Sequence, residues 1–158
     1  EKPGYTQLSQ SVFELDWIDR IDAAHVMLVA EGVFMYCKEQ DLKNLFRALQ
    51  NKLNNPEIVF EVVNSKWLKG WRKKAMEVKL NKQLHFGKGA MFTFGIPDSN
   101  AIESWNPGYR FMDDWSFIDT CKLFSRKRER FIRLDSLRKV QWTVHYQLHE
   151  SRFRTQHV

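Results

Sequence analysis

Residues 25–32 read His-Val-Met-Leu-Val-Ala-Glu-Gly, an apolar run that ends in an acid and a glycine. A strand that is apolar on both faces is typical of a parallel sheet covered by helices. We therefore expect a central, fully buried strand here. Ligands of open α/β sheets bind beyond the carboxyl ends of the strands. Glu31 and Gly32 are thus candidate ligand-binding residues, although a glutamate that only caps the next turn or pairs with a lysine is the alternative.

The segments that follow this run complete a strand–helix–strand unit. A stripe of apolar side chains predicts a helix over residues 38–54, and the stripe consists of Leu42, Leu45, Phe46, Leu49 and Leu53. Asn54-Asn55-Pro56 ends this helix, and residues 57–64 are rich in β-branched side chains, as strands are. The pattern predicts a βαβ unit with a right-handed crossover.

The remaining expected elements are shorter. They are a helical turn over 16–21 capped by Asp16, a basic helix over 65–84 capped by Ser65, a strand over 91–94, a helix over 100–105, a basic helix over 122–135 and a half-buried strand over 141–148. The fold class is α/β, a mixed sheet with helices on its faces, with too few strands for a complete doubly wound sheet.

Composition indicates one soluble globular domain. The chain has 158 residues, of which 43% are hydrophobic and 28% charged. No uncharged apolar stretch approaches the roughly 18 residues of a membrane span, so we expect no membrane partner. Cys37 and Cys121 are far apart and lack the spacing of metal ligands. We therefore expect no metal and a reducing, cytoplasmic location.

The positive charge is concentrated in two segments, residues 65–90 and 122–139, which hold eight basic residues each. Such segments form either solvated helix faces or a patch that binds nucleic acid or anionic lipid. The chain has no RNA-binding aromatic motif, zinc finger or helix-turn-helix pattern. This argues against nucleic acid as a partner, and a basic nucleic-acid-binding domain is kept as an alternative.

Several motifs carry a resemblance to a known family. Residues 28–36, Leu-Val-Ala-Glu-Gly-Val-Phe-Met-Tyr, resemble a strand end of the leucine carboxyl methyltransferase superfamily, and more closely its tetracenomycin polyketide synthesis O-methyltransferases. The likeness covers most of residues 5–148. Its other blocks are Ser11-Val12-Phe13 before Trp17-Ile18-Asp19, Phe94-Gly95-Ile96-Pro97-Asp98, Glu103-Ser104-Trp105-Asn106-Pro107-Gly108 and Asp114-Trp115-Ser116-Phe117.

The resemblance implies a class I, Rossmann-like fold that uses S-adenosylmethionine. The chain would supply the C-terminal portion of the methyltransferase domain over residues 1–150, followed by a polar tail over 151–158. The strand ending at Glu31 would be the fourth of the family's sheet and 57–64 the fifth. Residues 109–118 and 141–148 would hold its antiparallel edge. The function implied is methyl transfer to a carboxylate or hydroxyl of a small molecule in polyketide synthesis.

The resemblance also assigns roles to individual residues. Glu31, with Gly32, would hold the methionine part of the cofactor, and Ser11 and Val12 would lie against the adenine. Relatives in the leucine carboxyl branch carry an acid near Ser11, which this chain lacks. Tyr36 would face the substrate, or is an ordinary buried aromatic residue.

The family's glycine-rich turn and ribose-binding acid have no counterpart in this sequence. Gly87-Lys88-Gly89 follows a basic helix and indicates a turn. We therefore expect the chain alone to bind the cofactor poorly and to be inactive. Without the family's first half, the strand at 25–31 would leave an apolar edge that favours a homodimer or strand exchange.

No catalytic base is identified. A carboxylate acceptor is already ionised, whereas a hydroxyl would need a base, for which His25, His85 and His145 are available without a recognisable constellation. The alternative from a different class is a non-catalytic remnant or interaction module that retains the substrate-side lobe.

Overall fold

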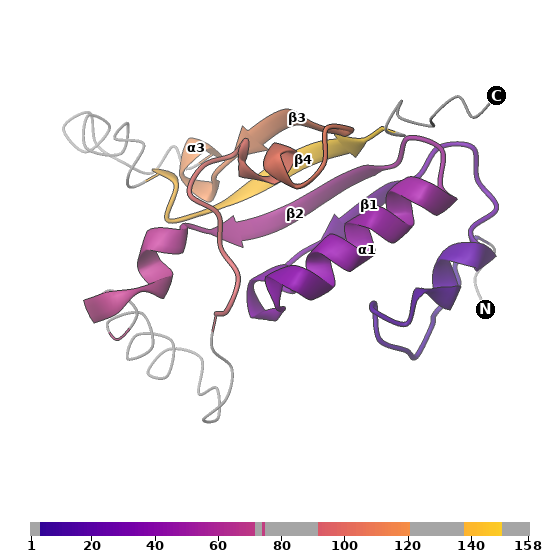
Figure 1. Ribbon diagram of the computed structural model, residues 1–158, viewed down its shortest axis with the longest axis horizontal. Helices are drawn as coiled ribbons and strands as arrows, with labels where there is room; N and C mark the ends of the chain where they lie inside the picture. The colour runs from indigo at the N-terminus through magenta and orange to yellow at the C-terminus, as the bar shows by residue number, and fades with distance from the viewer. Residues whose placement is uncertain (1–3, 72–73, 75–91, 121–137, 150–158) are drawn as a thin grey trace, which may run out of the picture.

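The computed structural model describes residues 4–71, 74, 92–120 and 138–149. Within these residues there are four strands, β1 to β4, two α-helices, α1 and α3, and four short 3-10 helices, η1 to η4 (Figure 1). In chain order they are η1 Leu15–Arg20, β1 Met27–Ala30, η2 Phe34–Tyr36, α1 Glu39–Lys52, β2 Glu57–Val63, η3 Ser65–Leu68, η4 Ala101–Trp105, β3 Tyr109–Trp115, α3 Phe117–Thr120 and β4 Gln141–Leu148.

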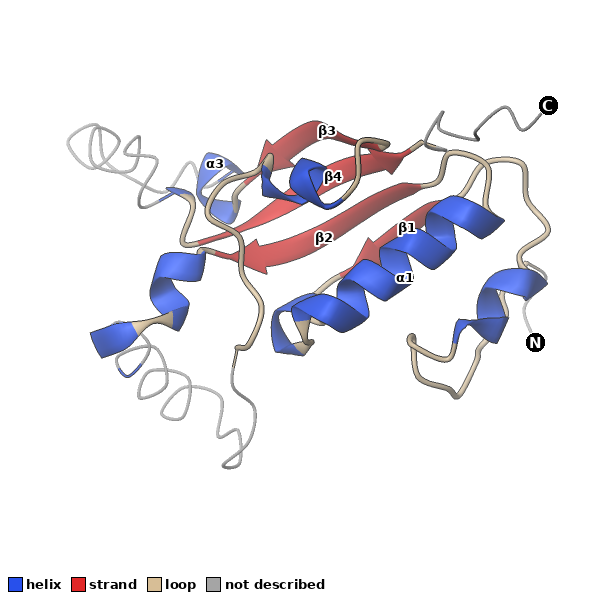
Figure 2. Ribbon diagram, viewed as in Figure 1, coloured by secondary structure: helices blue, strands red, loops and turns tan. Residues whose placement is uncertain are grey.

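The strands form one mixed sheet in the order β1-β2-β4-β3. β1 and β2 run parallel, while β4 is antiparallel to both β2 and β3. α1 crosses one face of this sheet (Figure 2). The expected strand–helix–strand unit and mixed α/β sheet are therefore confirmed. Of the two segments expected at the antiparallel edge, β3 lies at the edge and β4 in the interior.

The apolar run by itself predicted a central, fully buried strand at 25–32, and that prediction is wrong for the described sheet. The exposed apolar edge expected there without the family's first half is present. β1 lies at the edge of the described sheet and pairs only with β2 there. Met27 is 58% and Val29 71% exposed, whereas Leu28 and Ala30 pack against the core. An apolar run reports the character of a strand's two faces, but its place in the sheet depends on which distant strands pair with it.

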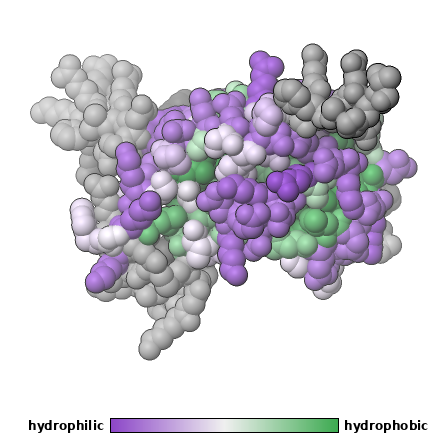
Figure 3. Space-filling model, in the orientation of Figure 1, coloured by the Kyte–Doolittle hydropathy of each residue, from purple (hydrophilic) through white to green (hydrophobic). Residues whose placement is uncertain are grey.

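The core lies between α1 and the sheet. The apolar stripe of α1 (Leu42, Leu45, Phe46 and Leu49) is fully buried against the inward-facing side chains of β2 and β4. Each such side chain contributes about 1.5–3 kcal/mol when it leaves water. The other side of α1 is largely polar, and hydrophilic residues cover most of the face that α1 presents in Figure 3.

Three local expectations are corrected by the structure. Asp16 lies in the first turn of η1 and is not its cap, and its carboxylate accepts a hydrogen bond from the Gln10 side chain. Asn64, rather than Ser65, caps η3, because its Oδ1 accepts from the Lys66 amide at 3.1 Å. Residues 92–94 form no strand, and Ile96 makes an isolated bridge to Asn64.

Several expectations fall outside the described residues. These are most of the basic helix over 65–84, the basic helix over 122–135, the turn at Gly87-Lys88-Gly89, His85, Cys121 and the tail over 151–158. In the part of the chain that the structure does describe, no helix is both long and apolar enough to span a membrane.

Candidate functional site

The turn that follows β1 carries the first two predicted site residues. Glu31 and Gly32 come directly after Ala30, and both are exposed. Gly32 has a φ of +65°, in the left-handed region that side chains disfavour, and a Cβ there would meet nothing within 4 Å. The backbone conformation therefore favours glycine, and the space above it is open.

A carboxylate from the neighbouring strand holds this turn. The Gly32 amide donates a hydrogen bond of 2.9 Å to Oε2 of Glu61 on β2. Glu61 was not singled out from the sequence. Its only signal was an acid inside an otherwise apolar stretch of strand, where acids are disfavoured.

The predicted substrate-side residue lies in the next element along the chain. Tyr36 ends η2 and is partly buried, and its ring centroid lies 5.2 Å from that of Phe92. The Thr93 and Phe94 amides both donate to the Met35 carbonyl, at 2.8 and 3.1 Å. These two bonds hold residues 92–94 against η2. η2 in turn follows Glu31 closely in the sequence.

The two residues predicted to contact adenine lie in the turn before η1. The Ser11 carbonyl accepts from the Glu14 amide at 3.0 Å, and the Val12 carbonyl accepts from the Trp17 indole at 2.9 Å. Ser11 is exposed, and Val12 packs against the core. Both carbonyls have a role in local structure, and contact with adenine stays a prediction.

Two of the described histidines, His25 and His149, lie near the amino ends of the parallel strands, and the ring of His145 reaches the same end from the middle of β4. His145 Nε2 lies 2.7 Å from Oε2 of Glu57, the first residue of β2, and His149 lies 3.2 Å from the Asn55 side chain. His25 precedes β1 and lines a hollow of about 340 Å³ with Asn54, Asn55, Glu57 and Gln147. The amino ends of the parallel strands therefore hold the histidines, and the carboxyl ends hold Glu31.

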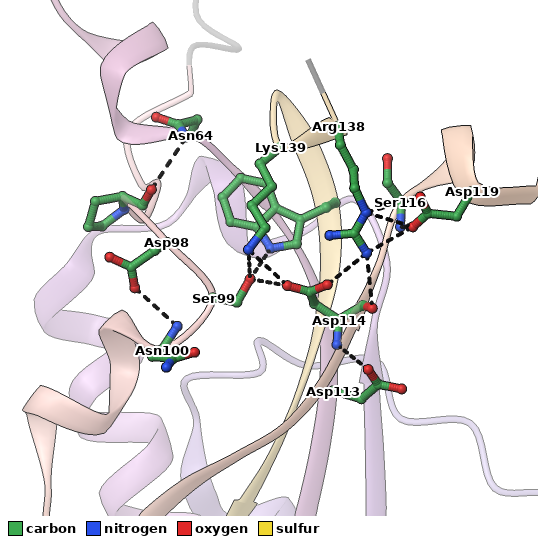
Figure 4. Close-up of polar contacts among 12 residues, drawn as sticks. Asn64, Asp98, Ser99, Asn100, Asp113, Asp114, Ser116, Asp119, Arg138 and Lys139 are labelled. Carbon is green, nitrogen blue, oxygen red and sulfur yellow. Dashed lines mark hydrogen bonds and ion pairs between the residues drawn. The ribbon is translucent and has the colours of Figure 1, made fainter. Parts of the chain in front are cut away.

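A second polar centre, not predicted from the sequence, surrounds a buried serine. We call it the Ser99 cluster: Ser99, Asp114, Asp119, Arg138 and Lys139 (Figure 4). Ser99 is 2% exposed, and its Oγ donates to the Asp114 carboxylate while accepting from the Lys139 ammonium at 2.9 Å. The Trp142 indole adds a hydrogen bond to the same oxygen at 3.0 Å.

Arg138 joins the two acids of the Ser99 cluster. Its guanidinium contacts Asp114 at 2.8 Å and Asp119 at 2.9 Å. Burial opposes the charge on Asp114, but hydrogen bonds from Ser99, Arg138 and Lys139 outweigh it and lower its pKa to about 2. The hydrogen bond from Arg138 likewise lowers the pKa of Asp119. The cluster joins the loop before η4 to the ends of β3 and β4, which is a structural role.

The Trp-Asn-Pro-Gly block also has a structural role. The Asn106 and Gln50 side chains bond reciprocally, with Nδ2 of Asn106 donating to Oε1 of Gln50 at 3.2 Å. A Cβ on Gly108 would clash with the His149 carbonyl oxygen and would lie 2.6 Å from Nε2 of Gln50. This corner, Gln50 with Asn106 and Gly108, locks the end of α1 against the strands β3 and β4.

Two other chemistries gain no support. The described residues include no group of three or more His, Cys, Asp or Glu that could hold a metal ion. Burial and the nearby Asp41 carboxylate raise the pKa of Cys37, which opposes formation of a nucleophilic thiolate.

Comparison with known proteins identifies a curated relative. The chain is 31% identical over 121 residues to the tetracenomycin polyketide synthesis O-methyltransferase TcmP of Streptomyces glaucescens, a match covering 76% of the chain. The chain spans 42% of that protein's length. No family model matches the chain.

Two solved structures show a weaker likeness. The N-methyltransferase NodS of Bradyrhizobium japonicum WM9 aligns with a TM-score of 0.40 at 8% identity, over 90% of this chain and 59% of that one. Its complex with S-adenosyl-l-homocysteine aligns with a TM-score of 0.41 at 8% identity, over 89% of this chain and 53% of that one.

Proposed function

The chain belongs to the methyltransferase family of the O-methyltransferase that it matches, and we propose that it is the C-terminal portion of an enzyme that methylates a carboxylate or hydroxyl of a small molecule. The methyl donor is S-adenosylmethionine, the cofactor of this family. The observation that carries the proposal is the Glu31–Gly32 turn at the carboxyl end of β1, where α/β sheets bind ligands.

The residues present at this turn suit the methionine part of the cofactor. That part carries an ammonium group, for which a carboxylate is a strong hydrogen-bond acceptor. Within the described residues, no hydrogen bond or ion pair engages the Glu31 side chain, and the residue is exposed. Glu31 would hold the ammonium, Gly32 would leave the approach open, and Ser11 with Val12 would lie against the adenine.

Methyl transfer needs few catalytic groups from this chain other than those that position the reactants. Methyl transfer from a sulfonium is an in-line displacement whose rate depends chiefly on alignment of the reacting atoms. Among the described residues, His25 and His149 lie at the opposite end of the sheet from Glu31, and the His145 ring is bonded to Glu57 at that end. This arrangement favours an acceptor that is already ionised, a carboxylate, over a hydroxyl that needs a base. Tyr36 would face that acceptor.

The proposal also assigns the two parts of the chain. Residues 1–150 would form the C-terminal portion of the methyltransferase domain, with 151–158 as a polar tail, and this portion alone would be inactive. The location would be cytoplasmic, which the free thiol of Cys37 suits.

For the chain without the family's first half, we also propose a partner for the edge of β1, namely β1 of a second copy of this chain. The strand Met27–Ala30 has no charged side chain, and Met27 and Val29 are exposed. An unpaired apolar edge is a template for another strand. Two copies of an uncharged edge do not repel, so a homodimer or strand exchange through β1 would cover both.

The cofactor role is tested in the full-length protein by binding of S-adenosylhomocysteine. Glu31→Gln should weaken binding about tenfold or more, because the amide keeps an acceptor oxygen but lacks the charge that pairs with the ammonium (about 1.5–3 kcal/mol for a hydrogen bond between charged groups). Glu14→Gln, an exposed acid before η1, is the matched control and should bind like wild type. Equal affinity of the Glu31→Gln and wild-type proteins would overturn the proposed role.

A further inference from the structure

A side chain of β2 contacts the turn after β1. Glu61 accepts a hydrogen bond from the Gly32 amide at 2.9 Å, across 29 residues of sequence. The turn itself lies at the surface, since Glu31, Gly32 and Val33 are all exposed. Its left-handed glycine gives the backbone more freedom than other residues have. A contact that fixes the Gly32 amide therefore restrains the residue from which the Glu31 carboxylate projects.

Glu61 is placed for this contact by the pleat of β2. Phe60 and Val62 point into the core, so Glu61 points to the other face of the sheet, where it is partly buried. It lies one residue beyond the last paired position of the two parallel strands, Ala30 with Phe60. The carboxylate is thus on the neighbouring strand, next to the point where β1 turns away.

The second acid on this face of β2 has a different partner. Glu57, at the start of the strand, pairs with His145 at 2.7 Å within the sheet. Glu61 bonds instead to the backbone of a turn, and a carboxylate accepting from an amide forms a stronger bond than a neutral acceptor would. Of these two carboxylates, Glu61 is the one that contacts the turn with the predicted cofactor residues.

We propose that Glu61 is a positioning residue for cofactor binding: by accepting from the Gly32 amide it holds the Glu31 carboxylate where the cofactor's ammonium binds. The inference rests on the proposed function. Glu61 itself contacts no cofactor atom in this scheme. Its effect on binding passes entirely through Glu31.

The experiment compares two replacements of Glu61 in the full-length protein. Glu61→Val suits a strand but removes the acceptor, and it should weaken S-adenosylhomocysteine binding about fivefold to tenfold, as loss of one hydrogen bond does. Glu61→Gln keeps an acceptor oxygen but loses the charge, so it should weaken binding less than Glu61→Val does. Glu57→Gln, the acid at the other end of the same strand face, is the matched control and should leave binding unchanged.

A double variant separates positioning from direct contact. Because Glu61 acts through Glu31, adding Glu61→Val to Glu31→Gln should weaken binding no further. Additive losses, or a Glu61→Gln variant as weak as Glu61→Val, would overturn the inference by showing that the Glu61 charge acts on the cofactor directly. Unchanged binding in Glu61→Val would overturn it as well.

Hydrogen exchange makes failure of this inference distinct from failure of the proposed function. In the chain without cofactor, Glu61→Val should speed exchange of the Gly32 amide, and Glu61→Gln should speed it less. If exchange responds but Glu31→Gln binds normally, the proposed function has failed. If Glu31→Gln binds weakly and Glu61→Val leaves both exchange and binding unchanged, only the positioning role has failed.

Discussion

The two edges of the sheet are built in opposite ways. β3, at one edge, has charged residues at Arg110, Asp113 and Asp114 and an irregularity between Phe111 and Asp113. β1, at the other, has four uncharged residues in regular register with β2. Charges and bulges are the devices by which natural sheets prevent further pairing. β3 therefore has features that prevent pairing with a further strand, whereas β1 has the features of an edge strand that can pair with another strand.

The two edge strands also differ in the number of side-chain contacts that hold them in place. The Glu103 carboxylate accepts from the Phe111 amide of β3 at 2.9 Å, and the Ser99 cluster holds the end of that strand. At the corner that precedes β3, Gly108 leaves no room for a side chain. The exposed turn after β1 is held by the bond from Gly32 to Glu61. We expect substitutions near β3 to change stability and substitutions on β1 to change association.

The largest effect on stability should come from Gly108→Ala. The added Cβ would clash with the His149 carbonyl oxygen, which forces β3 and β4 to shift. We expect the free energy of unfolding to fall by about 3 kcal/mol, the upper part of the range for overpacking. Urea denaturation measures it, with Pro107→Ala at the neighbouring exposed position as control, expected within about 0.5 kcal/mol. A Gly108→Ala protein as stable as this control would contradict the close packing of the corner.

A smaller effect, dependent on pH, should come from Asp114. Its pKa is lowered to about 2 in the folded chain from its ordinary value of 3.8, so its contribution is complete above about pH 4 and is lost as pH falls through about 2. The shift corresponds to about 2 kcal/mol. Urea denaturation at pH 5 and pH 2 should show this loss in the wild-type protein, and Asp119 should add to it in the same direction.

The Asp114→Asn variant should lack the Asp114 part of this pH dependence. It should also be less stable at neutral pH, because Arg138 and Lys139 lose a common carboxylate. Asp113→Asn, the exposed neighbour, is the control and should retain the full dependence. An unaltered pH profile in Asp114→Asn would show that the Ser99 cluster does not contribute as its geometry indicates.

The smallest effect on stability, and the largest on association, should come from Val29→Lys on β1. Val29 is 71% exposed, so the free energy of unfolding should change by less than about 0.5 kcal/mol. Light scattering of the 158-residue chain should show self-association of the wild type and its loss in the variant. Met112→Lys, on the β3 edge and 46% exposed, is the matched control and should associate like wild type. A wild-type chain that stays monomeric at every concentration would refute the β1 partner.

Elements with a clear local period were predicted well. The apolar stripe of α1, the β-branched run of β2 and the alternation of β4 were each found at nearly the observed bounds. Caps and short connections were predicted less well. Asn64 caps η3 in place of Ser65, and residues 92–94, expected within a strand, instead form a segment whose amides bond to Met35. The cap differs by one residue because either of two adjacent polar side chains can accept from the first amides of η3, and the bonds of residues 93 and 94 depend on a distant carbonyl.

The residues of the candidate site differ in the same way in whether they could be predicted from the sequence. Glu31 and Gly32 were predicted from the sequence because a strand that ends in an acid and a glycine is a local signal, and their role in cofactor binding stays a prediction. Glu61 was not found, because its role exists only through a bond to an amide 29 residues away. Asp114, in turn, was recognised only as part of a resembling block, and its hydrogen bond with Ser99 was not foreseen.

The helix, the strands with a clear period, the α/β class and the turn at Glu31 can all be read from the amino-acid order. Those properties follow from the spacing of apolar side chains along a few turns of helix or residues of strand. The exposed edge of β1 was expected only from the resemblance, with the family's first half missing. The irregularity that closes β3 to further pairing and the bond from Gly32 to Glu61 emerge only in the folded chain. They depend on contacts between segments far apart in the chain, and the periodicity of a segment does not show which distant segment it contacts.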